Sequence, residues 1–154
     1  IAWREDSDLQ FSLLERGFRI ERAAQAVVVH PLRRAPWGIS LRQQRKGVFN
    51  SLLFRKHRQL YRRHIPRFPA GYYAMAILLP AAVVLALWGQ PLWAGAAFAA
   101  WLVPFGRFFA RRLRGTSKAP AHVLEMFVTS ALIPLVACYW LIRGNIRYRV
   151  LRFF

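Results

Sequence analysis

Residues 71–106, GYYAMAILLPAAVVLALWGQPLWAGAAFAAWLVPFG, decide the fold of this chain because they contain no charged side chain. The first part, 71–89, is about as long as the ~20 residues that cross a bilayer as a helix. Only Gly89 and Gln90 join it to the second uncharged run, 91–106. Tyrosines at the start of the first run and a tryptophan near its end suit the two bilayer interfaces. The pattern predicts a tight hairpin of two membrane helices.

Basic segments flank this hairpin on both sides. The chain has 24 Lys and Arg against six Asp and Glu, which gives a net charge of +18. Positive charge favours the cytoplasmic side of a membrane, so we expect residues 1–67 and the loop 107–122 to be cytoplasmic. A basic excess of this size also implies an anionic partner. Beside such apolar runs, membrane lipid and phosphorylated substrates are favoured, and no nucleic acid partner is expected.

A third apolar run, 123–142, carries Glu125 and Pro134 and precedes a basic tail, 143–154. If the run spans the bilayer, the tail lies outside, against the charge rule. If it is re-entrant or lies in the interface, both of its ends stay inside, and this arrangement is slightly favoured. The chain is thus expected to divide into residues 1–67 and a membrane region, 68–154.

The region before the hairpin predicts helices and strands. A helix is expected over residues 6–16, capped by one of its first acidic or serine residues and ended by Gly17. The β-branched run 26–30, ended by a proline, predicts a buried strand, and 18–20 a shorter one. The expected fold class is therefore α/β at first, followed by an all-α membrane region.

A second helix is expected to start at Ser40, which forms a capping-box pattern with Gln43. Arg42, Arg45 and Lys46 fall at i, i+3 and i+4, so three cations share one face of this helix. Arginine forks suit diphosphate oxygens. The same face also fits a solvated surface or a patch for anionic lipid.

The acidic residues are concentrated in one place, since five of the six lie between Glu5 and Glu21. The motif Glu5-Asp6-Ser7-Asp8 taken alone is more often a helix start than an active site, because carboxylates stabilise the positive end of a helix. The alternative is a carboxylate that removes a proton from a hydroxyl nucleophile. No His, Cys or carboxylate set has metal-ligand spacing, so no metal-binding residue is predicted.

Taken together, three segments resemble the C-terminal part of a family-2 inverting glycosyltransferase with C-terminal membrane helices. These are EDSDL at 5–9, LERGFRI at 14–20 and RQQRKG at 42–47. The family carries an E-D-x-D-L segment, a helix ending near a glycine, and a Q-x-x-R-W-like motif, in this order. Two positions depart from it: Lys46 stands where an aromatic residue is usual, and Arg42 where the opening glutamine falls.

The resemblance implies a GT-A nucleotide-binding fold and transfer of a sugar from a nucleotide-sugar donor to a lipid-linked or envelope-glycan acceptor. The enzyme would lie in a bacterial inner membrane with its catalytic part in the cytoplasm. Asp6 would be the general base, with Glu5 beside it. The substrate-binding residues would be Asp8, Arg42, Gln43, Arg45 and Lys46.

The resemblance further implies a divalent cation, Mg or Mn, whose D-x-D ligands belong to the N-terminal half of the family's catalytic domain, which is absent from this sequence. Because the sequence opens on Ile1, directly before the acidic motif, we expect it to be part of a longer protein and inactive alone. The alternative is a non-catalytic membrane protein whose basic cytoplasmic region binds anionic lipid or a partner protein.

Overall fold

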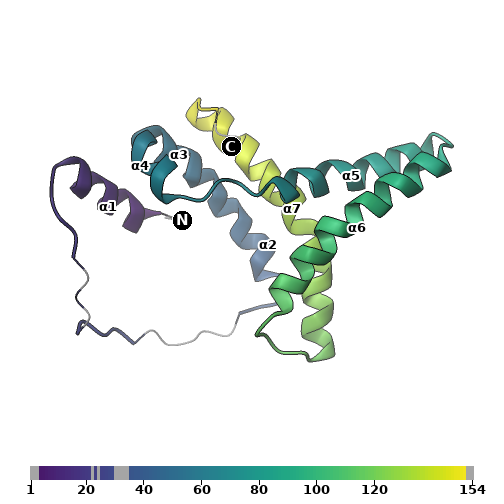
Figure 1. Ribbon diagram of the computed structural model, residues 1–154, viewed down its shortest axis with the longest axis horizontal. Coiled ribbons are helices and arrows are strands. Elements are labelled where there is room, and N and C mark those ends of the chain that lie inside the picture. Colours follow the sequence, from purple (N-terminus) through teal and green to yellow (C-terminus); the bar gives the residue numbers. More distant parts are fainter. Residues whose placement is uncertain (1–3, 22, 24, 30–34, 152–154) are drawn as a thin grey trace.

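The computed structural model describes residues 4–21, 23, 25–29 and 35–151, and every regular element in these ranges is a helix (Figure 1). Helix α1 comes first in the chain, and after a long connection a cluster of short helices precedes the membrane region. Three long helices follow. The elements are α1 (Glu5–Glu15), α2 (Ile39–Gln43), the 3₁₀ helix η1 (Gln44–Gly47), α3 (Val48–Lys56), α4 (Arg58–His64), α5 (Ala70–Leu87), α6 (Pro91–Leu113) and α7 (Pro120–Tyr148).

The predicted α/β fold class is wrong for the part of the chain that the structure describes, because it holds no strand. Neither 18–20 nor the described part of 26–30 pairs with another segment, and His30 lies outside the described residues. Val27, Val28 and Val29 are 80%, 74% and 85% exposed. A β-branched run becomes a buried strand only when neighbouring strands satisfy its backbone groups and cover its side chains.

Helix α1 begins and ends within one residue of the predicted bounds. Gly17, at φ 83°, ends it as expected. The N–H of Gly17 donates to the Leu14 carbonyl, and the N–H of Phe18 to the Leu13 carbonyl, which is a Schellman motif. The expected acidic or serine cap is wrong, since Arg4 holds the N-cap position and no side chain caps the helix.

The capping box predicted at Ser40 is also wrong. Helix α2 begins one residue earlier, after Gly38, which adopts φ 71°. The N–H of Gly38 donates to Oε1 of Glu125 at 2.8 Å, so a carboxylate from α7 takes the place of a local cap. Ser40 instead accepts a hydrogen bond from the Arg112 guanidinium.

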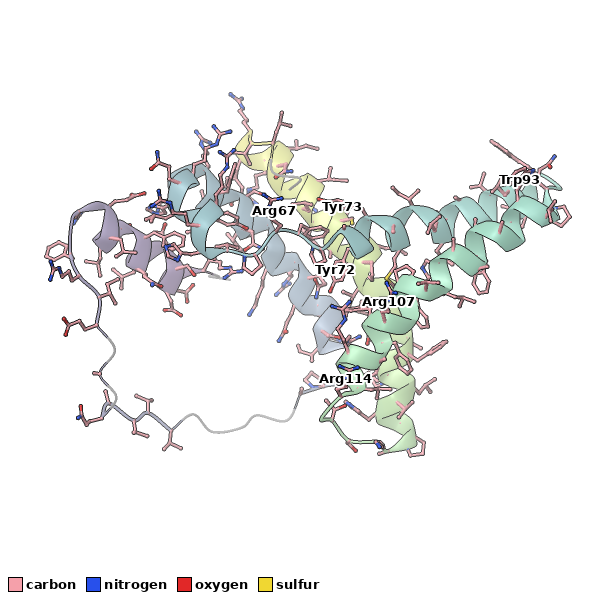
Figure 2. The ribbon with its side chains drawn as sticks, viewed as in Figure 1. Arg67, Tyr72, Tyr73, Trp93, Arg107 and Arg114 are labelled. Carbon is pink, nitrogen blue, oxygen red and sulfur yellow. The ribbon has the colours of Figure 1, made fainter. Side chains whose placement is uncertain are left out.

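Helices α5 and α6 pack along each other as the predicted hairpin (Figure 1). The predicted end of the second helix at residue 106 is wrong, because α6 continues to Leu113 and includes the first residues of the expected loop 107–122. Both are long and apolar enough to span a membrane. At ~1.5 Å per residue, the 18 residues of α5 extend about 27 Å, close to the ~30 Å apolar thickness of a bilayer. Trp93 lies at the tip, while Arg67, Tyr72 and Arg107 lie at the base (Figure 2). The described chain therefore has the composition and length of an integral membrane protein.

The third apolar run forms α7, a continuous helix that does not break at the buried Pro134. This helix packs against α2, η1, α3, α5 and α6, so it joins the membrane hairpin to the short helices. Its other face is apolar and exposed, as a lipid-facing surface would be; the residues are Leu124, Phe127, Leu132, Tyr139, Ile142 and Ile146. Whether α7 crosses the bilayer or lies along it stays a prediction, as does the division at residue 67.

The contact between α3 and α7 is unusually close. Ser51 donates to Oδ1 of Asn145 at 2.9 Å, and both side chains are buried. A Cβ added to the neighbouring Gly144 would lie 2.9 Å from the carbonyl oxygen of Val48. Only a glycine lets the two backbones approach this far.

Helix α1 packs against α3 and α4 through a small apolar core. Phe11 is 2% exposed and lies among Leu53, Phe54 and Tyr61. This core fixes the acidic helix next to the basic segment 55–67.

Candidate functional site

Two carboxylates of α1 form hydrogen bonds or ion pairs with residues at the end of α3. Lys56 donates to Asp8 at 2.5 Å. His57, 4% exposed, lies between Asp8 at 3.0 Å and Glu15 at 2.8 Å, with one ring nitrogen facing each. A neutral imidazole donates from only one nitrogen, so both contacts are hydrogen bonds together only when both nitrogens carry a proton. Asp8 and Glu15 therefore hold α1 in place.

The hydrogen bond from Lys56 is the main reason that the pKa of Asp8 lies below its usual value of 3.8. Since the pKa is lowered by folding, the stabilisation is present above about pH 4 and is lost as pH falls through the lowered value. We expect Asp8→Asn to weaken the docking of α1 by less than ~1 kcal/mol, because Asp8 is partly exposed.

The distance between spin labels at Gln10 and Gln59 measures this docking. Acidification to about pH 3 is expected to broaden the distance distribution of the native chain. At neutral pH, Asp8→Asn should already show part of that broadening. Asp6→Asn on the same helix is the control and should leave the distribution unchanged. Equal broadening in the two variants would show that Asp8 does not hold the helix.

The proposed general base, Asp6, and its neighbour Glu5 are exposed on the first turn of α1. Neither makes a hydrogen bond or ion pair within the described part of the chain. Glu5 and Asp8 line a hollow of about 200 Å³ that also contains Lys56. Asp6 does not line it. The two exposed carboxylates are thus free to meet a ligand, whereas Asp8 is not.

The predicted substrate-binding cations come together in one place. We call it the cationic hollow, a space of about 520 Å³ lined by Ile39, Leu41, Arg42, Gln43, Arg45, Lys46 and Trp140. Arg42, Gln43 and Arg45 are exposed, and no carboxylate in the described residues pairs with either arginine. Guanidinium groups placed this way suit an anionic ligand with several oxygens.

The sequence does not identify Trp140 as a site residue, because an aromatic residue inside an apolar run is typical of a buried core or of an interface anchor. The structure places Trp140 on the α7 side of the cationic hollow. Arg143 lies over its ring, 5.0 Å from the centroid. The hollow therefore joins a basic segment before the hairpin with a helix after it.

Arg112 was also missed as the residue that holds this arrangement together. It donates to Thr129 at 2.7 Å and to Ser130 at 2.8 Å, both on α7, and to Ser40 on α2 at 3.2 Å. The buried hydroxyls of Thr129 and Ser130 could have signalled a buried polar partner. The sequence alone does not show which arginine reaches them.

The two halves of the predicted site are not joined. The hollow beside Glu5 and Asp8 and the cationic hollow share no lining residue. Residues of α1 and α3 line the first hollow together with Arg4, whereas residues of α2, η1 and α7 line the second. The carboxylates and the cations of the predicted site thus face different spaces.

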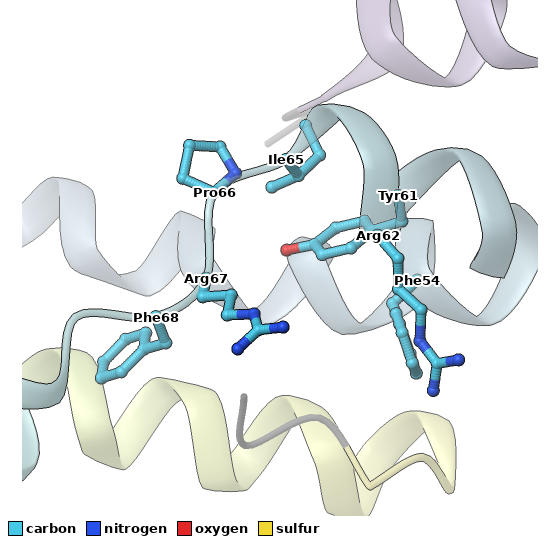
Figure 3. A pocket seen from close by; sticks show the side chains of 7 residues that line it. All are labelled: Phe54, Tyr61, Arg62, Ile65, Pro66, Arg67 and Phe68. Atoms are coloured by element: carbon cyan, nitrogen blue, oxygen red, sulfur yellow. The ribbon is translucent and has the colours of Figure 1, made fainter.

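A further basic hollow, of about 370 Å³, lies where α4 passes into the linker before α5 (Figure 3). The side chains of Tyr61 and Arg67 approach it from opposite sides. Arg62 lies over the Phe54 ring, 5.8 Å from the centroid. The mixture of arginine and aromatic side chains is typical of a membrane interface.

No three His, Cys, Asp or Glu side chains are grouped to hold a metal ion within 4–21, 23, 25–29 and 35–151. Asp8 and Glu15, moreover, are already engaged by Lys56 and His57. The described residues therefore show no group that fits the divalent cation implied by the resemblance.

Comparison of the chain with known protein families, with curated proteins and with solved structures finds no match.

Proposed function

We propose that this protein is the membrane-anchored part of a glycosyltransferase. It acts with a nucleotide-sugar donor and a lipid-linked or envelope-glycan acceptor at the cytoplasmic face of a bacterial inner membrane. The observation that supports this most is the cationic hollow. Four residues selected from the sequence for substrate binding, Arg42, Gln43, Arg45 and Lys46, line one space together with Trp140.

The hollow has the chemistry of a diphosphate site. Arg42 and Arg45 offer guanidinium forks that pair with no carboxylate of the described residues, and Gln43 adds an amide that can both donate and accept. Helix α7 forms one wall and is itself apolar on its exposed face. A donor held here would thus lie close to an acceptor carried by lipid.

Asp6 is the proposed general base. Its side chain is exposed and pairs with no other side chain in the described residues, so its carboxylate is available to take the proton from an acceptor hydroxyl. That oxygen attacks the anomeric carbon of the sugar, whose bond to the diphosphate breaks, and a nucleoside diphosphate leaves. Glu5 stands beside it at the edge of the other hollow. In the proposed reaction an acceptor would extend past the N-terminal end of α1.

Binding of UDP by the natural protein, measured by titration calorimetry, tests the role of the hollow. Arg42→Gln/Arg45→Gln is expected to weaken binding about 30-fold, because two charge-assisted hydrogen bonds to phosphate are lost. The control removes two exposed arginines that line none of the hollows described above, Arg63→Gln/Arg114→Gln, and should change binding less than ~3-fold. An equal loss in both variants would mean that net charge, and not this site, attracts the nucleotide.

A second candidate is a non-catalytic protein whose basic region binds anionic lipid. It is favoured by one observation: the carboxylates and the cations of the predicted site face separate hollows. This candidate predicts no saturable binding of UDP. It also predicts binding to anionic vesicles that weakens with salt and is unchanged by Asp6→Asn.

A further inference from the structure

A hollow of about 470 Å³ lies at the base of the membrane hairpin, between the start of α5 and the last turns of α6. We call it the hairpin-base hollow. Along α6, its lining changes from apolar residues nearer the hairpin tip to arginines nearer the base. The lining residues are Pro69, Gly71, Tyr72, Met75, Val103, Pro104, Arg107, Phe108, Arg111 and Arg112.

The three arginines differ in what they contact. Arg112 is fixed by Thr129, Ser130 and Ser40, and Glu125 nearby offsets its charge. Arg107 and Arg111 are exposed, and no carboxylate of the described residues forms an ion pair with either. The only hydrogen bond described for their side chains is a 3.4 Å contact from Arg111 to the Arg107 carbonyl. These two positive charges thus have no paired carboxylate in the part of the chain that the structure describes.

At the apolar end of the hollow, no helix of the described residues covers Val103. Val103 is 56% exposed, and Met75 forms the buried floor. A Cβ on Gly71 would lie 4.0 Å from Cβ of Pro104, so the helices approach closely at this level and leave the hollow beside them. A hydrocarbon chain lying along α6 would cover Val103 and Pro104.

The level of the hollow along the hairpin fits a bilayer headgroup region. Tyr72 and Arg107 lie at the base, and Trp93 lies at the tip (Figure 2). From Trp93 to Arg111 the helix rises about 27 Å at ~1.5 Å per residue, close to the ~30 Å apolar thickness of a bilayer, and Arg107, one turn nearer the tip, can extend its side chain to the same level. An arginine at this depth, beside an interfacial tyrosine, meets lipid phosphate.

We propose that the hairpin-base hollow binds one anionic phospholipid. The phosphate lies between Arg107 and Arg111, and an acyl chain lies over Val103 and Pro104. Charge complementarity and bilayer depth both select this ligand. The site is separate from the cationic hollow and does not depend on the proposed transfer of sugar.

The test is native mass spectrometry of the full chain in detergent, titrated with phosphatidylglycerol. A single saturable adduct is expected. Arg107→Gln/Arg111→Gln should weaken it about 30-fold, from the loss of two cations near a lipid headgroup. Val103→Trp keeps every charge but fills the acyl end of the hollow, and should weaken the adduct about 10-fold.

The control is Arg114→Gln/Lys118→Gln, which removes two exposed cations just beyond the hollow and should change the adduct less than ~3-fold. A loss in this control equal to that of Arg107→Gln/Arg111→Gln would overturn the proposal. So would phosphatidylcholine binding as tightly as phosphatidylglycerol. Displacement by inorganic phosphate at millimolar concentration, with no effect of Val103→Trp, would reassign the hollow to a free anion and contradict a lipid site.

Discussion

Replacing Gly144 with valine is expected to separate α3 from α7 and to lower the free energy of unfolding by about 3 kcal/mol. The Cβ would lie 2.8 Å from Oγ of Ser51 and 2.9 Å from the Val48 carbonyl oxygen. The serine can turn, but the carbonyl belongs to the backbone and cannot move alone. Its displacement would also break the buried Ser51–Asn145 hydrogen bond.

The matched control is Gly106→Val on α6, where an added Cβ meets nothing within 4 Å. Thermal unfolding in detergent, followed by tryptophan fluorescence, should give a clear drop in midpoint for Gly144→Val and little change for Gly106→Val. Gly144→Val should also weaken UDP binding, because the cationic hollow has one wall on η1 and one on α7. Equal midpoints for the two variants would show that the close approach of α3 and α7 contributes little.

The membrane hairpin could be predicted because its signal is local. An uncharged run of bilayer length forms a helix whatever surrounds it, since the backbone has no other way to satisfy its hydrogen bonds in lipid. The signal that ends α1, Gly17, is local in the same sense. A strand over 26–30, in contrast, cannot be predicted from local signals alone. Its β-branched residues require partner strands, and the described residues supply none.

The site could be predicted only in part, for the same reason. The spacing of Arg42, Arg45 and Lys46 places them on adjacent turns, and they do line one hollow. Trp140 joins them through the packing of α7, almost a hundred residues later, which no local pattern shows. The sequence predicts a helix cap at Ser40, because no local pattern shows that Arg112 donates to its hydroxyl.

The largest effect on activity is expected from Asp6→Asn, which should lower sugar transfer at least ~100-fold, the typical contribution of a general base. The amide keeps the size of the carboxylate but cannot take the acceptor proton. Because the Asp6 side chain is exposed and forms no hydrogen bond or ion pair within the described residues, the substitution should leave the fold intact. Glu21→Gln is the matched control, an exposed carboxylate outside the helix, and should retain the native rate.

Sugar transfer itself tests the central claim most directly. Membranes that contain the natural protein, given labelled nucleotide sugars, should incorporate label into extracted lipid or envelope glycan. Asp6→Asn should reduce this incorporation at least ~100-fold while Glu21→Gln does not. Native-level incorporation by Asp6→Asn, with the protein present in equal amount, would contradict the assignment of Asp6. Absence of incorporation by the native protein from every nucleotide sugar would contradict the glycosyltransferase proposal as a whole.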